Sequence, residues 1–198
     1  MERDSISPRA GLGLAALALA LACAAAPAVA AENASATIAS QQLSATSWQY
    51  SITLDDIGTT PLGTLWFAWV PGEDFMPTAP SGIDSPTGWT AKVTHAGAAD
   101  GYAIQWKATT PAGLLAPGQS LGGFSFDSAT SPDAMMGDSP FFAGVPVTTS
   151  FVYQGAPFSD AGVKFAVSSV PEPSSLALMG LGALAFAFKA ARRRPAAA

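Results

Sequence analysis

The sequence is poor in the residues that build most catalytic and metal sites. Its 198 residues include one cysteine, Cys23, and one histidine, His95. A single histidine excludes a metal site built from several histidines, and a Ser-His-Asp triad would have to use His95. No Gly-x-Ser-x-Gly motif is present, so the sequence contains no recognisable apparatus for nucleophilic catalysis. We therefore expect a protein that is not an enzyme and that uses no metal or cofactor.

Positive charge is scarce away from the two ends of the chain. Residues 31–170 contain three lysines and no arginine against eleven acidic residues, which gives this middle segment a net charge of −8. Nucleic-acid binding depends on Lys and Arg side chains that neutralise phosphates. An acidic segment without arginine repels phosphates, so we expect no nucleic-acid partner.

Residues 1–30 are predicted to be a secretory signal peptide. Two arginines precede an uncharged segment, residues 10–26, that is rich in Ala and Leu. Ala28 and Ala30 then supply the small residues of an A-x-A cleavage site, so the mature protein is expected to begin at Ala31. A retained membrane helix or a buried core helix is the alternative.

The cysteine lies inside this predicted signal peptide. Residues 20–23 are similar to a bacterial lipobox, in which Cys23 would become the lipidated first residue, but Ala20 stands where a large aliphatic residue is usual. Cleavage after Ala30 would leave a mature protein with no cysteine, and therefore with no disulfide and no thiol chemistry.

The other end of the chain is predicted to cross a membrane. Residues 174–191 form an apolar segment with one charge, Lys189, near its end. As a helix this segment would be about 27 Å long, which is within reach of a bilayer core. The basic cluster consists of Lys189, Arg192, Arg193 and Arg194. Because such clusters stay in the cytoplasm, residues 31–170 are expected on the outer side of the inner membrane.

The tripeptide Pro171, Glu172 and Pro173 directly precedes this apolar segment. Its prolines keep the backbone extended, which would leave the peptide bonds accessible to a processing enzyme. The order of Pro-Glu-Pro, short hydrophobic helix and terminal arginines resembles the PEP-CTERM sorting domain of Gram-negative, biofilm-forming bacteria. The resemblance covers residues 171–198. It implies processing by an exosortase and an association with exopolysaccharide export and the extracellular matrix. An ordinary single-span anchor is the alternative.

Three segments follow from these features: a signal peptide at residues 1–30, an ectodomain at 31–169 and a sorting and anchor segment at 170–198. The expected partners are signal peptidase, exosortase, the membrane and, in one version, exopolysaccharide. We expect an anchored precursor with a periplasmic ectodomain, and a mature form at the cell surface or outside the cell.

The ectodomain has the patterns of short β-strands. Residues 48–55 alternate between apolar and polar side chains, which predicts a half-buried strand, and residues 63–70 are apolar on both faces, which suits a central strand. Further strands are predicted at residues 90–95, 102–109, 120–126, 148–153 and 163–167. Seven to nine such strands favour an all-β, antiparallel β-sandwich, with an immunoglobulin-like arrangement as one version.

Other parts of the ectodomain are predicted to be irregular. Residues 71–88 and 127–145 are expected to be long loops, with a single helical turn near residues 132–136. Residues 32–42 suit either a mobile N-terminus or an edge strand. Ser168 and Ser169 are expected to begin a linker to the anchor.

Acidic side chains offer two weak site candidates. The adjacent pairs Asp55–Asp56 and Glu73–Asp74 could serve glycoside hydrolysis, but both lie beside turn signals where acids are ordinarily solvated. A second set, Asp127, Asp133 and Asp138, shares one loop without the spacing of a calcium-binding EF-hand.

Aromatic residues give the last candidates. The five tryptophans fall in or beside predicted strands at buried positions, so core packing is the expected role of most. Trp69 and Trp89 flank the proline-rich loop and Phe75 lies within it, which makes these three the candidates for stacking on a sugar. His95 is expected to be a structural residue at the edge of a core face.

These observations predict an exported structural protein of the cell surface or biofilm matrix. The alternative is a carbohydrate-binding module that recognises exopolysaccharide.

Overall fold

The structure is a computed structural model that describes residues 31–97 and 99–170. The predicted signal peptide, the Pro-Glu-Pro tripeptide, the predicted membrane helix and the basic cluster lie outside the described residues. Within the described part of the chain, no helix has the length and apolar character needed to cross a membrane.

The described residues are mostly β-strand, as predicted. The strands are β1 (Ala34–Ser44), β2 (Ser47–Asp56), β3 (Thr64–Phe67), β4 (Trp69–Val70), β5 (Glu73–Asp74), β6 (Ser81–Asp84), β7 (Trp89–Thr94), β8 (Ala103–Ala108), β9 (Ser120–Ser128), β10 (Thr149–Tyr153), β11 (Val163–Ala166) and β12 (Ser168–Ser169). Two short helices accompany them, the 3₁₀ helix η1 (Pro111–Gly113) and α1 (Pro132–Met136).

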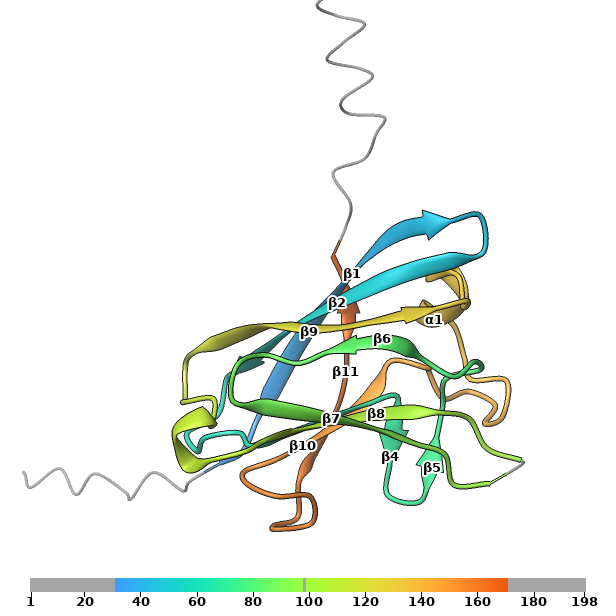
Figure 1. The fold of residues 1–198 in the computed structure, drawn as a ribbon. Coiled ribbons are helices and arrows are strands. Elements are labelled where there is room, and N and C mark those ends of the chain that lie inside the picture. Colours follow the sequence, from blue (N-terminus) through green and yellow to red (C-terminus); the bar gives the residue numbers. More distant parts are fainter. Residues whose placement is uncertain (1–30, 98, 171–198) are drawn as a thin grey trace, which may run out of the picture.

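The strands build a β-sandwich of two five-stranded sheets and a small hairpin (Figure 1). The first sheet has the order β12-β1-β2-β9-β6 and the second the order β11-β10-β3-β8-β7. All ladders are antiparallel except that of β1 with β12, which is parallel. The antiparallel β-sandwich predicted from the sequence is therefore confirmed.

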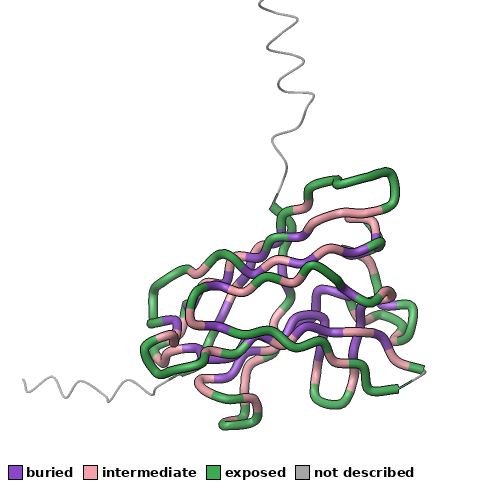
Figure 2. The backbone as a smooth tube through the Cα atoms, viewed as in Figure 1, coloured by how far each residue is buried: buried purple, intermediate pink, exposed green. Residues whose placement is uncertain are grey.

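The hydrophobic core lies between the two sheets, where Figure 2 shows the buried residues concentrated. Alternate residues of each strand face inward because side chains alternate along a β-strand. The inward-facing residues of the first sheet include Ile52, Leu54, Phe124 and Phe126, and those of the second include Leu65, Phe67, Ile104 and Trp106. All eight are 1% exposed or less, so the segment has a complete core of its own.

Several strands match the sequence patterns closely. β3 is buried at every residue and lies in the centre of its sheet, as its apolar character predicts. β7 and β8 form the predicted hairpin pair. The predicted single helical turn is α1, whose N-cap Ser131 accepts a hydrogen bond from the amide of Ala134 at 3.4 Å.

Three predictions about irregular segments were wrong. The loop predicted at residues 71–88 contains β5 and β6, which pair with β4 and β9. Ser168 and Ser169 do not begin a linker but form β12, which pairs with Thr37 and Ile38 of β1. The N-terminal segment is neither mobile nor an edge strand. It forms β1, which lies between β12 and β2.

Candidate functional site

The hairpin of β4 and β5 separates two hollows on the surface of the sandwich. Its turn is Pro71-Gly72, in which proline fixes φ and Gly72 has φ +93°, the combination that a type II turn requires. Trp69 pairs with Asp74, and both line one hollow; Val70 pairs with Glu73, and both line the other.

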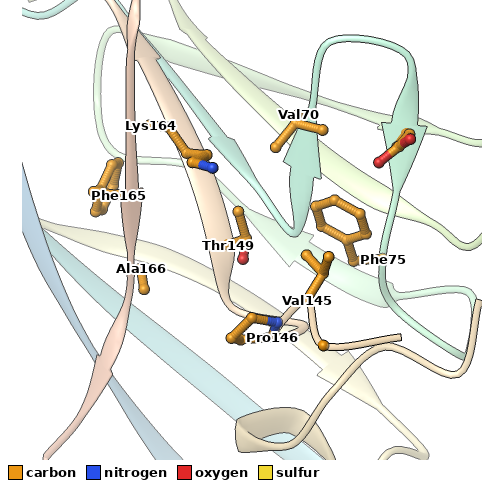
Figure 3. Close-up of a pocket in the computed structure, with 10 residues that line it drawn as sticks. Val70, Phe75, Val145, Pro146, Thr149, Lys164, Phe165 and Ala166 are labelled. Atoms are coloured by element: carbon orange, nitrogen blue, oxygen red, sulfur yellow. The ribbon is translucent and has the colours of Figure 1, made fainter. Parts of the chain in front are cut away.

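The first hollow, here called the β4–β5 pocket, has a volume of about 400 Å³. It is lined by Val70, Glu73, Phe75, Gly144, Val145, Pro146, Thr149, Lys164, Phe165 and Ala166. Figure 3 shows Lys164 extending from the edge strand β11 toward the side of the pocket where Val70 lies. Apart from Lys164 and Glu73 its walls carry no charge, so this pocket suits an apolar group rather than a reaction that needs several polar groups.

The second hollow, here called the Phe158 groove, has a volume of about 420 Å³. Its lining is Trp66, Trp69, Gly72, Asp74, Lys92, Val93, Thr94, His95, Ala96 and Phe158. It lies on the outer face of the second sheet, since Trp66 points away from the core that its neighbours Leu65 and Phe67 fill.

Two stacked tryptophans form the floor of this groove. The rings of Trp66 and Trp69 are parallel to within 1° with centroids 3.6 Å apart. Residues three apart on a regular strand face opposite sides of the sheet. Here Ala68, with φ +58°, interrupts the strand between β3 and β4 and turns Trp69 onto the same side as Trp66.

A chain of two hydrogen bonds, here called the polar relay, holds Trp66 in the floor of the groove. The indole nitrogen Nε1 of Trp66 donates to Oγ1 of Thr94 at 3.2 Å, and that hydroxyl donates to Oδ1 of Asp74 at 2.9 Å. Burial raises the pKa of Asp74 above its usual value, although the hydrogen bond from Thr94 acts in the opposite direction. The relay therefore holds the tryptophan ring and the carboxyl group in one arrangement.

His95 forms the polar rim of the groove together with Lys92. Its ring stacks on Tyr102 with centroids 4.4 Å apart, and Nδ1 lies 2.6 Å from the carbonyl oxygen of Gly101. A carbonyl oxygen can only accept, so Nδ1 carries the proton and Nε2 of the neutral ring is an acceptor. His95 was predicted to be a structural residue at the edge of a core face, but it is exposed, because it directly follows β7, the outermost strand of its sheet, in which only Trp89 is buried.

The three residues predicted to stack on a sugar do not form an exposed platform. Trp69 is 4% exposed, Trp89 5% and Phe75 fully buried. Trp89 packs edge-on against Phe124 in the core and donates from Nε1 to the carbonyl oxygen of Gly113 at 2.8 Å. The loop that was expected to present these residues contains β5 and β6, which pair with β4 and β9. This strand pairing holds the aromatic rings in buried positions.

Phe158 is an exposed aromatic residue that no sequence pattern had indicated as a site residue. It is 63% exposed and lies in the connection between β10 and β11, directly after the turn residues Gly155-Ala156-Pro157 in the sequence. A lone phenylalanine in such a connection has no periodic neighbours, so its position over the tryptophans could not be read from the sequence.

The acidic candidates do not converge. Within each adjacent pair one residue is buried, Asp56 at 1% and Asp74 at 2% exposure, while Asp55 and Glu73 face the other side of their strands. Asp56 and Asp74 are therefore not solvated as their positions beside turn signals suggested, because β2 and β5 include both residues. In residues 31–97 and 99–170, no three or more His, Cys, Asp or Glu side chains are placed to hold a metal ion, and Asp127, Asp133 and Asp138 form no such group.

Comparisons with solved structures found distant similarity. A biomass-sensing module of the Rsgi2 protein from Clostridium thermocellum, described as resembling a family 3 carbohydrate-binding module of the cellulosome, is 12% identical over 70% of this chain and 98% of that one, with a TM-score of 0.41. The chitin-binding domain of Chi18aC from Streptomyces coelicolor is 30% identical over 48% of this chain and 78% of that one, with a TM-score of 0.32. A Nocardia farcinica protein with an immunoglobulin-like fold is 10% identical over 67% and 98%, with a TM-score of 0.37.

The sequence comparisons are informative at the C-terminal end. No curated protein sequence matches the chain. A family model, the PEP-CTERM protein-sorting motif, matches residues 169–194, which include the Pro-Glu-Pro tripeptide and the three arginines. The chain therefore carries a PEP-CTERM sorting motif, which implies export, processing by an exosortase and a destination at the cell surface or outside the cell.

Proposed function

We propose that this protein is a structural, non-enzymatic component of the cell surface or biofilm matrix of a Gram-negative bacterium. The observation that carries the proposal is the sorting motif joined directly to a sandwich with its own core. The motif begins at residue 169, which is the last residue of β12. Because the sorting signal directly follows a folded domain, processing of the signal would release that domain intact to the cell exterior.

A structural role is supported by the way the polar groups are used. The most deeply buried carboxyl groups, Asp56 and Asp74, accept hydrogen bonds from Gly58 and Thr94. His95 is held by its contacts with Gly101 and Tyr102. In the described part of the chain, Asp74 is the one acidic residue that lines the Phe158 groove, whereas glycoside hydrolysis requires two carboxyl groups across one site.

The proposed maturation has two steps. Signal peptidase cleaves after Ala30, and the precursor is then held in the inner membrane by residues 174–191 with its ectodomain in the periplasm. An exosortase next cuts near Pro171, Glu172 and Pro173, releasing the ectodomain for transfer to the surface. The immunoglobulin-like version of the sandwich stays a prediction, as do the segment boundaries at residues 30 and 169.

The processing step is tested with Pro173→Ala in a host that has an exosortase. Insertion depends on the apolar segment and the arginines, which this substitution leaves unchanged. We expect wild-type protein in the surface or matrix fraction to lack residues 174–198 by mass spectrometry, and the variant to accumulate at full length in the membrane. Ser174→Ala, just beyond the tripeptide, is the matched control and should be processed normally. Wild-type surface protein that retains its tail would show that the segment is an ordinary anchor.

Carbohydrate binding is the second candidate function. It is favoured by the exposed ring of Phe158 beside the polar rim of the Phe158 groove. An exported module with such a surface would attach to exopolysaccharide rather than serve only as a structural unit.

A further inference from the structure

The ring of Phe158 is supported from beneath although it is exposed. It packs edge-on against Trp66 and Trp69, with centroid distances of 5.8 Å to each, and at a tilt against Tyr153 at 5.6 Å. Phe158 is equally distant from two parallel rings whose centroids are 3.6 Å apart, so it lies beside the edges of the stacked tryptophans, which cover at most one of its faces. Phe158 therefore presents a flat apolar surface to solvent from a fixed position.

Unfavourable backbone geometry is concentrated at this cluster. The two non-glycine residues with positive φ among the described residues are Ala68, at +58°, and Phe158, at +63°. Ala68 places Trp69 against Trp66, and Phe158 contacts the rings of both tryptophans. Left-handed backbone at non-glycine residues is unfavourable and is concentrated at functional sites in proteins. Core packing alone gives no reason for holding an exposed phenylalanine in this conformation.

Hydrogen-bonding groups lie along the other side of the groove. Lys92 offers the donors of its ammonium group, and His95 offers an acceptor at Nε2 because Nδ1 is committed to Gly101. Thr94 and Asp74 are already bonded to each other and form the inner wall. The groove therefore has an apolar flat side and a polar rim, in a volume of about 420 Å³ that is typical of small-molecule sites.

We infer that the Phe158 groove binds a neutral saccharide, with one pyranose ring stacked on Phe158 and its hydroxyl groups bonded to Lys92 and His95. This inference rests on the carbohydrate-binding form of the proposed function. A pyranose ring has a face of C–H groups and a rim of hydroxyls, each of which can donate and accept. That combination matches a flat apolar side facing a donor and an acceptor. An acidic sugar fits less well, because residues 31–170 carry a net charge of −8.

The test uses the full chain purified in a detergent without a sugar headgroup. The probes are neutral hexasaccharides of β-1,4-glucose, β-1,3-glucose and β-1,4-N-acetylglucosamine, with an alginate hexamer as the acidic comparison. Affinities are measured by isothermal titration calorimetry. We expect at least one neutral probe to bind, and Phe158→Ala to weaken that binding by about ten-fold or more through loss of the stacked ring.

Two further variants separate stacking from packing. Phe158→Leu keeps an apolar cover over the tryptophans but has no flat face, so it should bind as weakly as the alanine variant, whereas Phe158→Trp should bind at least as well as wild type. Phe141→Ala removes another partly exposed phenylalanine, 38% exposed and not part of the groove, and should leave binding unchanged. Thermal unfolding of each variant confirms that it is folded.

The inference is overturned if no neutral probe binds, if only alginate binds, or if Phe158→Leu binds like wild type. Its failure is distinguishable from failure of the proposed sorting function, because Phe158 variants should still be processed at the C-terminal tail. Normal tail processing without saccharide binding would support the proposed sorted structural protein and would contradict only the proposed binding site in the groove.

Discussion

The stability of the domain should fall as pH rises from about 4.5 to about 7, and Glu32 contributes to this fall. Burial, together with the nearby carboxyl groups of Asp160 and Asp56, raises the pKa of Glu32 to about 7. Its Oε1 atom is buried without a hydrogen-bond partner among the described residues. In the native state the protonated form of the Glu32 side chain is therefore favoured up to a pH of about 7.

The direction of the effect follows from proton linkage. In the unfolded chain Glu32 titrates near 4.5, so between pH 4.5 and about 7 the native state binds more protons than the unfolded state. The free energy of unfolding is highest below this window, decreases across it and is level above it. Because Glu32 is partly exposed, solvent screening reduces the effect to about 1 kcal/mol, well below the full value of the pKa shift.

Thermal unfolding followed by tryptophan fluorescence at pH 5, 6, 7 and 8 measures this decrease. About 1 kcal/mol corresponds to a loss of roughly 3 °C in Tm for a domain of this size. Glu32→Gln removes the ionisable group, so its Tm should depend less on pH and should exceed that of wild type at pH 8. Both proteins must have the same N-terminus, because cleavage before Ala31 would create an ammonium group beside Glu32. Identical pH profiles for the two proteins would refute the reasoning.

Two further substitutions test the packing of the sandwich. Tyr50→Phe removes a buried hydroxyl that donates to the carbonyl oxygen of Thr130 at 2.6 Å, and it should lower the free energy of unfolding by about 1 kcal/mol in urea denaturation; an unchanged midpoint would contradict this. Gly101→Ala would place a Cβ atom 2.6 Å from the carbonyl oxygen of Met76, which should cost about 2 kcal/mol or more, whereas Gly97→Ala, with open space around it, should cost well under 1 kcal/mol in the same assay. Equal effects of the two alanines would show that the backbone at Gly101 has room to adjust.

Much of the sandwich could be predicted from the sequence because its strands carry local signals. The alternation around Tyr50 and Ile52 and the apolar run that contains Leu65 and Phe67 record burial on one or both faces, and burial is what a β-sandwich requires. The turns between them contain Gly and Pro, whose conformational preferences act locally.

The candidate site could not be predicted in the same way because it depends on contacts between distant segments. Trp66 and Trp69 meet only because Ala68 adopts a left-handed conformation, and no sequence rule assigns that conformation to an alanine. Phe158 reaches them from a connection about ninety residues further along the chain. The short strands β5, β6 and β12 were missed for a related reason, since each is stabilised by a partner strand rather than by its own pattern.

The parallel pairing of β12 with β1 determines how mechanical load would enter the folded domain. The last backbone hydrogen bond before the sorting tripeptide runs from the amide of Val170 to the carbonyl oxygen of Ile38 at 2.9 Å, with no slack chain between it and Pro171. In the proposed anchored precursor, a pull on the ectodomain would act on β12 first and, through the buried side chain of Val167, on the sandwich core. β12 would thus transmit tension on the tail directly to the sheet that contains β1.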